Sequence, residues 1–152
     1  MRFFFCLRIS EILALSRNDI RLVPDFDGLV LSILIRSSKT DQEKNGATRM
    51  LRATGSDLCP VQATQRFLTL LPANSGDASL FPKVFRARLA ETMKWAATRN
   101  NIPSAVVNTH SLRAGCATAL FSAGVDWVTI QRWGDGSRSC FMPIFGMIIL
   151  AS

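Results

Sequence analysis

The sequence contains no tyrosine and only one histidine, His110. The missing tyrosine excludes every reaction in which a phenolic oxygen of this chain would attack a substrate. The four cysteines, Cys6, Cys59, Cys116 and Cys140, are widely separated and form no Cys-x-x-Cys pair. With a single histidine beside them, these cysteines do not make a pattern typical of a zinc site.

Long apolar segments are also missing. The apolar run 3–7 is too short for the core of a secretory signal, and Arg8 and Glu11 follow it closely. We therefore expect an intracellular protein whose cysteines are reduced and mostly buried. The most apolar late stretch, 140–151, has about twelve residues interrupted by a proline and a glycine, against the ~20 that a membrane helix requires. The sequence predicts no membrane-spanning segment.

The composition of the chain is that of a basic globular domain. Apolar residues make up 48% of its 152 residues and charged residues 19%, which favours one packed domain. Eighteen Lys and Arg residues against eleven Asp and Glu residues give a net charge of +7. Such an excess of positive charge favours a polyanionic partner. Nucleic acid is the first candidate for that partner, and an acidic membrane surface is the second.

Hydrophobic periodicity predicts mainly helices, with strands only in the first third of the chain. We expect a helix over 3–16, a turn at 25–28, and two antiparallel strands at 29–35 and 47–53 around a long polar tip. Further helices are expected over 60–71, 85–100, 110–122 and 126–133. Asn108 or Thr109 is expected to cap the third of these, and Asp126 the last. The predicted fold class is mainly α with a small antiparallel β-hairpin sheet, an α+β fold.

Three places in the chain carry side chains suited to gripping a phosphate: Arg8 with Glu11, Lys39 near the hairpin tip, and His110 with Arg113. His110 and Arg113 are three positions apart, so both lie on one face at a helix N-terminus, where backbone N–H groups favour an anion. Two arginines can fork onto the non-bridging oxygens of a phosphodiester, while a lysine can protonate the departing oxygen. These residues predict metal-free phosphoryl-transfer chemistry.

The same residues lie within an ordered set of motifs: Phe4-Phe5-Cys6-Leu7-Arg8-Ile9-Ser10-Glu11-Ile12-Leu13-Ala14-Leu15, Ser38-Lys39-Thr40-Asp41, His110-Ser111-Leu112-Arg113-Ala114-Gly115, Ala123-Gly124-Val125-Asp126 and Ile130-Gln131. In order and separation this set resembles the catalytic domain of the tyrosine recombinases, the phage integrase family. The resemblance covers about residues 3–142. We therefore expect an integrase-type catalytic domain over 1–142 and a divergent apolar tail over 143–152.

The resemblance also implies roles for individual residues. In the family two arginines, a lysine and a histidine surround the scissile phosphate, and the matching positions here are Arg8, Arg113, Lys39 and His110. By the same resemblance Lys39 protonates the leaving group, His110 supports proton transfer, and Glu11 orients Arg8. No metal or other cofactor is implied. The implied partners are double-stranded DNA and other recombinase subunits, in DNA recombination or integration.

The chain departs from the family at the catalytic nucleophile. The family's tyrosine forms a 3′-phosphotyrosyl bond, and its position falls here on Ile144 or Phe145, neither of which has an oxygen to attack phosphorus. A further phosphate-contacting His or Trp falls on Gly136. We therefore expect DNA binding without strand cleavage, unless another subunit supplies a tyrosine in trans. Restoring cleavage should need Ile144→Tyr or Phe145→Tyr, together with His or Trp at position 136.

The chain also departs from the family at its two ends. The family's catalytic domain usually begins before its first arginine helix and is usually paired with a separate helical domain that clamps the other face of the DNA. Relative to that pattern, this chain is expected to be incomplete at its N-terminus. The tail after Met142 does not resemble the family either, which predicts truncation or loss of frame near that end.

Several of these residues also fit ordinary structural roles. Arg8 with Glu11 fits a solvated helical ion pair, and Lys39 fits a solvated charge close to Lys44. His110 also fits a helix cap. The simplest role for three later residues is in the core: Cys116, Leu120 and Phe121. Trp127 and Trp133 fit either core positions or surface anchors.

A second function class uses residues 117–133. These fit a helix-turn-helix with Gly124 at the bend, in which Thr129, Gln131 and Arg132 would read the major groove. This interpretation ranks second because it leaves the set of Arg8, Lys39 and His110 unexplained. A third interpretation is an inactive recombinase relic with marginal stability.

Overall fold

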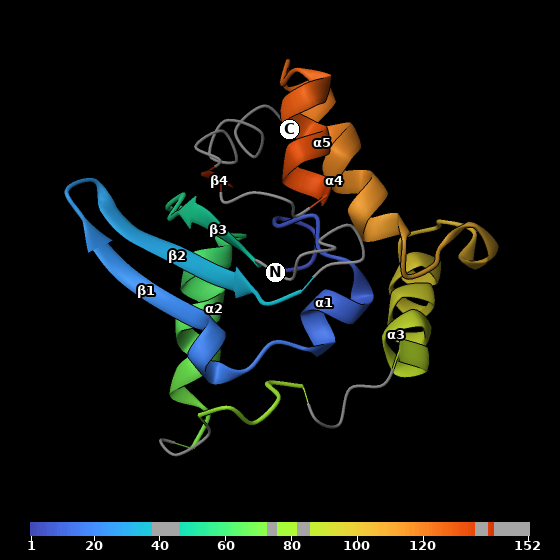
Figure 1. The fold of residues 1–152 in the computed structure, drawn as a ribbon. Coiled ribbons are helices and arrows are strands. Elements are labelled where there is room, and N and C mark those ends of the chain that lie inside the picture. The colour runs from blue at the N-terminus through green and yellow to red at the C-terminus, as the bar shows by residue number, and fades with distance from the viewer. Residues whose placement is uncertain (38–45, 73–75, 82–85, 136–139, 142–152) are drawn as a thin grey trace.

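The computed structural model describes residues 1–37, 46–72, 76–81, 86–135 and 140–141. Within these ranges a small sheet packs with five α-helices, which gives the α+β fold that the sequence predicted (Figure 1). The strands are β1 (Ile20–Asp25), β2 (Gly28–Ile35), β3 (Ala47–Arg52) and β4 (Cys140–Phe141). The helices are α1 (Ile9–Leu13), α2 (Pro60–Thr69), α3 (Arg86–Arg99), α4 (Ser111–Ser122) and α5 (Trp127–Asp135), with 3-10 turns η1 (Arg17–Asp19) and η2 (Ser104–Val106).

The predicted antiparallel hairpin is confirmed as β2 and β3, which pair from Val30 opposite Arg52 to Ile35 opposite Ala47. Gly46 leads into β3 with a positive φ of 68°. A Cβ atom there would lie 2.9 Å from the carbonyl oxygen of Ile35, so the close approach of the two strands requires glycine. The long tip of the hairpin lies outside the described residues.

The sheet is larger than the sequence predicted, because 20–25 forms a third antiparallel strand, β1, along β2. The predicted turn at 25–28 joins these two strands. Pro24 obscures the strand signal in the sequence, and it is tolerated because β1 is the first strand in the order β1-β2-β3-β4. At the other side of β3, β4 adds a short parallel pairing.

The expected helix over 3–16 is wrong over most of its length, since α1 spans only Ile9–Leu13. Residues 2–6 form turns instead, and Cys6 has a left-handed backbone with φ of 48°. A helix cannot continue through such a residue. Phe5 and Leu7, two positions apart, are both fully buried in this irregular segment. The apolar residues of this segment therefore belong to a tightly packed loop and not to the helix that their spacing predicted.

The expectation that all cysteines are reduced is wrong for two of them. Cys6 and Cys116 form a disulfide across 110 positions of sequence, with their Cα atoms 5.7 Å apart. The bond connects the segment before α1 to the middle of α4. Cys59 is free and buried, as expected. Sequence separation could not reveal the pair, because only the packing of the first segment against α4 brings the two cysteines together.

The four helices expected after residue 60 are confirmed as α2 to α5. Asp126 caps α5 as predicted, because its Oδ1 accepts a hydrogen bond from the backbone N–H of Thr129. Figure 1 shows α2 lying against the sheet, while α4 and α5 lie alongside each other and run in opposite directions. The core between these elements contains apolar side chains that are fully buried: Phe5, Leu7, Leu31, Ile33, Val61, Cys116, Leu120 and Trp133.

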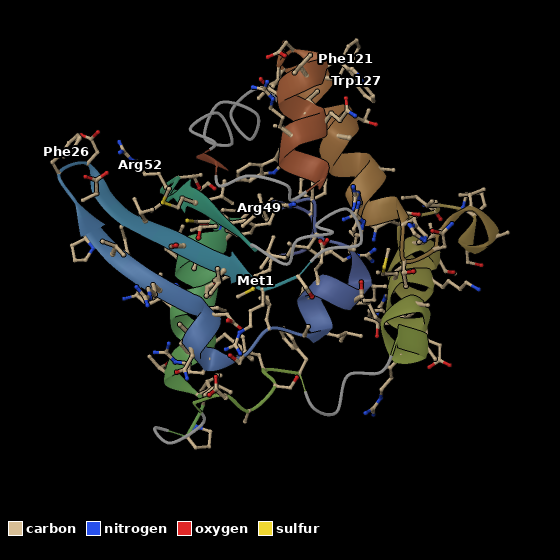
Figure 2. All side chains as sticks on the ribbon, in the orientation of Figure 1. Met1, Phe26, Arg49, Arg52, Phe121 and Trp127 are labelled. Atoms are coloured by element: carbon tan, nitrogen blue, oxygen red, sulfur yellow. A yellow bond between two sulfur atoms is a disulfide. The ribbon has the colours of Figure 1, made fainter. Side chains whose placement is uncertain are left out.

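One expected core residue lies on the surface. Phe121 is 66% exposed, although its neighbour Leu120 is buried, because adjacent residues of a helix point about 100° apart. Of the two tryptophans, Trp133 is buried and its ring stacks on that of Phe5, whereas Trp127 is 64% exposed. Figure 2 shows Phe121 and Trp127 at the outer end of the α4–α5 pair.

Candidate functional site

Arg8 directly precedes α1 and is held by Glu11. Its Nη1 donates to Glu11 Oε1 at 2.9 Å, and its backbone N–H donates to Glu11 Oε2 at 2.7 Å, the second bond being the reach-back of a capping box. The Glu11 side chain is 2% exposed, while that of Arg8 is 21% exposed. This geometry is not that of a solvated ion pair. The carboxylate lies inside the protein and fixes the direction of a guanidinium near the surface.

Arg113 lies in the first turn of α4 and is held by a different acceptor. Its Nη2 donates to the carbonyl oxygen of Gly134 at 3.0 Å, at the C-terminal end of α5. A helix C-terminus carries partial negative charge, so it attracts a cation. A Cβ atom at position 134 would lie 3.3 Å from this nitrogen, which makes the small residue part of the arrangement. The bond to this carbonyl orients the Arg113 guanidinium.

Arg49 shares this acceptor and was not predicted as a site residue. Its side chain is fully buried, and its Nη2 donates to Gly134 O at 3.2 Å while its Nη1 donates to Phe5 O. The guanidinium carbon lies 5.6 Å from the ring centre of Trp133, within range of a cation–π interaction. Figure 2 shows Arg49 in the interior, near the N-terminus of the chain. The sequence signal for this burial was the alternation of side-chain direction along β3, because Arg49 lies at a two-residue spacing from the buried Ala47 and Leu51.

His110 is exposed and directly precedes α4. Its backbone N–H donates to Asn108 Oδ1 at 2.7 Å, and the backbone N–H of Asn108 donates to Ser111 Oγ at 3.0 Å. The N-cap of α4 is His110, without a side-chain capping bond, so the expected cap at Asn108 or Thr109 is wrong; Asn108 instead orders the turn before the helix, and Thr109 is buried. The His110 carbonyl accepts the backbone N–H of Arg113, which places the two residues one helical turn apart.

The Cys6–Cys116 disulfide brings the segments of Arg8 and Arg113 together. Arg8 lies two positions after Cys6, and Arg113 lies three positions before Cys116. Chain geometry then keeps the Cα atoms of the two arginines within about 18 Å of each other. Phe3 packs on α4 as well, because a Cβ atom added at Gly115 would lie 3.4 Å from a carbon of the Phe3 ring.

A pocket of about 330 Å³ opens beside this junction. Arg113 supplies its positive charge, and the wall is completed by Cys6, Ala117, Trp127, Ile130, Gln131 and Gly134. Arg8 does not line the pocket but lies two positions from its wall. Arg8 and Glu11 lie at the start of α1, His110 and Arg113 lie at the start of α4, and the Cys6–Cys116 bond joins these two segments.

The remaining predicted site positions are Lys39, Gly136, Ile144 and Phe145, and all four lie outside the described residues. In the parts of the chain that the structure describes, no three His, Cys, Asp or Glu side chains group as metal ligands. Across the same parts, the helices are too short or too polar to cross a membrane.

The alternative site on α4 and α5 has mixed geometry. Gln131 and Arg132 are exposed, whereas Thr129 is half-buried at the start of α5. Gly124 forms the bend with φ of 81°. The bend joins α4 to α5, and the two helices pack against each other.

Comparisons with protein-family models, with curated proteins and with solved structures found no match to this chain.

Proposed function

We propose that this chain is a DNA-binding domain of the tyrosine-recombinase type that grips the DNA backbone through Arg8, Arg113 and His110. The observation that carries the proposal is the junction at the Cys6–Cys116 disulfide. It holds the segment of one predicted phosphate-binding arginine against the helix that bears the other.

The chemistry of the junction supports phosphate binding. Arginine presents its N–H donors in a planar fork that matches two phosphate oxygens, and such a fork binds best when its orientation is already set. Glu11 and the Gly134 carbonyl set the two orientations. The net charge of +7 favours a polyanion over a small neutral ligand.

Without a tyrosine, the domain binds DNA and does not cut it. Arg8 and Arg113 contact phosphate oxygens, and His110 contacts the same backbone from the start of α4. The chain has no phenolic oxygen to form a covalent DNA adduct. Binding of this kind depends on phosphates, so it is largely independent of base sequence.

The test is the affinity for a short DNA duplex, measured by fluorescence anisotropy over a salt series. Arg113→Gln removes one cation of the site. Arg8→Gln is combined with Glu11→Gln, so that no buried carboxylate is left unpaired. Arg88→Gln, at an exposed position of α3, is the matched control for Arg113→Gln, because each lowers the net charge by one, whereas Arg8→Gln/Glu11→Gln leaves the net charge unchanged.

The parent protein is expected to bind with a steep salt dependence. Arg113→Gln should weaken binding about tenfold and reduce the slope of log K against log salt by about 0.9, the loss of one phosphate contact. Arg8→Gln/Glu11→Gln should do the same, and Arg88→Gln should change little. Equal binding by the parent and both site variants would contradict the proposal.

The helix-turn-helix interpretation predicts another pattern. In that case Gln131→Ala/Arg132→Ala would abolish discrimination between DNA sequences. The site variants at Arg8 and Arg113 would then leave that discrimination unchanged.

A further inference from the structure

The Cys6–Cys116 disulfide connects the segment that leads to Arg8 with the helix that carries Arg113. Cys6 is 1% exposed and Cys116 is fully buried. Cys6 also lines the same pocket of about 330 Å³ as Arg113. Cys6 is thus part of the wall of the proposed site, and the pocket is the side from which a small thiol would approach the bond.

The backbone at Cys6 needs an external constraint. Its φ of 48° is in the left-handed region, which residues with a Cβ atom rarely adopt. Such a conformation persists only where the surroundings hold it. The disulfide to α4 is a covalent restraint on this residue, and hydrogen bonds from Cys6 N to Phe3 O and from Leu7 N to Arg2 O add to it.

The direction of the chain after Cys6 decides where Arg8 lies. Leu7 is fully buried, and Arg8 begins the short helix α1. Because α1 has only five residues, its own helical hydrogen bonds do not stabilise it, and its position depends on its packing and on the segments at its ends. Release of Cys6 from α4 would therefore let Arg8 move relative to Arg113.

We propose that the Cys6–Cys116 disulfide positions Arg8 against Arg113, so that DNA binding by this domain depends on its oxidation state. The inference rests on the proposed function. Reduction by a dithiol breaks the S–S bond, each cysteine sulfur gains one electron and one proton, and the dithiol becomes a disulfide. Under conditions that favour the folded state strongly enough to offset the loss of the bond, the reduced protein keeps its fold but loses the alignment of Arg8, and air oxidation or an oxidised thiol restores it.

The experiment compares oxidised and dithiothreitol-reduced protein at low temperature with trimethylamine N-oxide, which favours the folded state. Far-UV circular dichroism checks that both forms have the same helix content. DNA affinity is measured by anisotropy over a salt series. Amide hydrogen exchange is measured in parallel for residues 2–8 and for α4, without DNA.

Four proteins separate a positioning role from a purely structural one. They are the parent, Cys6→Ser/Cys116→Ser, Arg8→Gln/Glu11→Gln, and the control Arg88→Gln. Reduction should weaken DNA binding by the parent and by Arg88→Gln about tenfold and reduce the salt slope by about one contact. The serine variant should bind like the reduced parent and ignore dithiothreitol. Arg8→Gln/Glu11→Gln should bind equally in both redox states, because the residue that the bond positions is gone.

Each other outcome identifies which claim is wrong. Equal binding by oxidised and reduced parent, both folded, would overturn the positioning role, and so would a redox effect that persists without Arg8. A reduced form that is unfolded under these conditions would also overturn it, because the bond would then serve the whole fold. If even the oxidised parent binds no DNA, the proposed function fails. Hydrogen exchange then decides the remaining claim: faster exchange at residues 2–8 alone supports local positioning, and unchanged exchange refutes it.

Discussion

Replacing Arg8 with methionine tests how far the Arg8–Glu11 pair is removed from water. The Glu11 side chain is 2% exposed and accepts one hydrogen bond from the Arg8 guanidinium and one from its backbone N–H. Arg8→Met keeps the aliphatic part of the side chain and the backbone bond, but it removes the positive charge. A nearly buried carboxylate is then left with only part of its compensation.

The expected loss of stability follows from this burial. Breaking a buried ion pair by removing one partner costs about 3–5 kcal/mol, whereas exposed pairs contribute about 0–1 kcal/mol. Arg8 retains 21% exposure, so we expect about 3 kcal/mol. Arg8→Met/Glu11→Gln should recover most of the loss, because the second change removes the unpaired charge. Glu11→Gln alone completes the double-mutant cycle.

Urea denaturation followed by circular dichroism measures the free energy of unfolding of the four proteins. With a urea m-value of about 2 kcal/mol/M, the loss in Arg8→Met shifts the midpoint by about 1.5 M. Unchanged m-values would show that the comparison reports on the folded state. A loss below about 1 kcal/mol in Arg8→Met, or no recovery in the double variant, would refute the reasoning. The pair would then contribute no more to stability than an exposed ion pair.

Three further predictions concern the rest of the fold. Burial raises the pKa of Asp19, but hydrogen bonds from Arg36 and Ser16 outweigh it and hold that pKa below its ordinary value. The stabilisation is therefore complete above about pH 4 and is lost as the pH falls through the folded-state pKa, so Asp19→Asn should reduce stability at pH 7 and flatten its acid dependence in urea titrations. Trp133→Ala should lower the free energy of unfolding by about 3–5 kcal/mol and Trp127→Ala by less than about 0.5 kcal/mol, and a similar loss in both would contradict the burial described. Gly46→Ala should cost about 2 kcal/mol, as measured by thermal unfolding, and a neutral result would show that the strands separate easily at that point.

The parts of the fold that the sequence could predict depend on local patterns. The hairpin of β2 and β3 followed from β-branched and leucine-rich runs around an Asn-Gly pair, and the cap at Asp126 followed from one side chain at the start of an apolar period. Such signals involve residues close in sequence, so no tertiary information is needed to find them.

The parts that sequence reasoning missed depend on contacts between distant segments. Residues 3–8 have helical periodicity, but their backbone is set by the disulfide to α4 and by the burial of Phe5 against Trp133. Arg49 looks like a surface residue of a hairpin until Gly134 and Phe5 are placed beside it. For the candidate site, the sequence could pair Arg8 with Glu11, a contact that the structure contains, but it could not show which acceptor orients Arg113.

The disulfide also changes the unfolded state of this chain. Because it joins positions 110 residues apart, nearly the whole sheet and helices α1 to α3 lie within one covalent ring, while α5 lies outside it. A ring of this size restricts the unfolded ensemble by about 5 kcal/mol in the chain-entropy model. Entire domains are stable by about 5–15 kcal/mol, so this single bond is comparable with a large part of that range. The oxidised chain therefore begins folding with its first segment and α4 already neighbours, and contacts that are distant along the sequence become short-range ones.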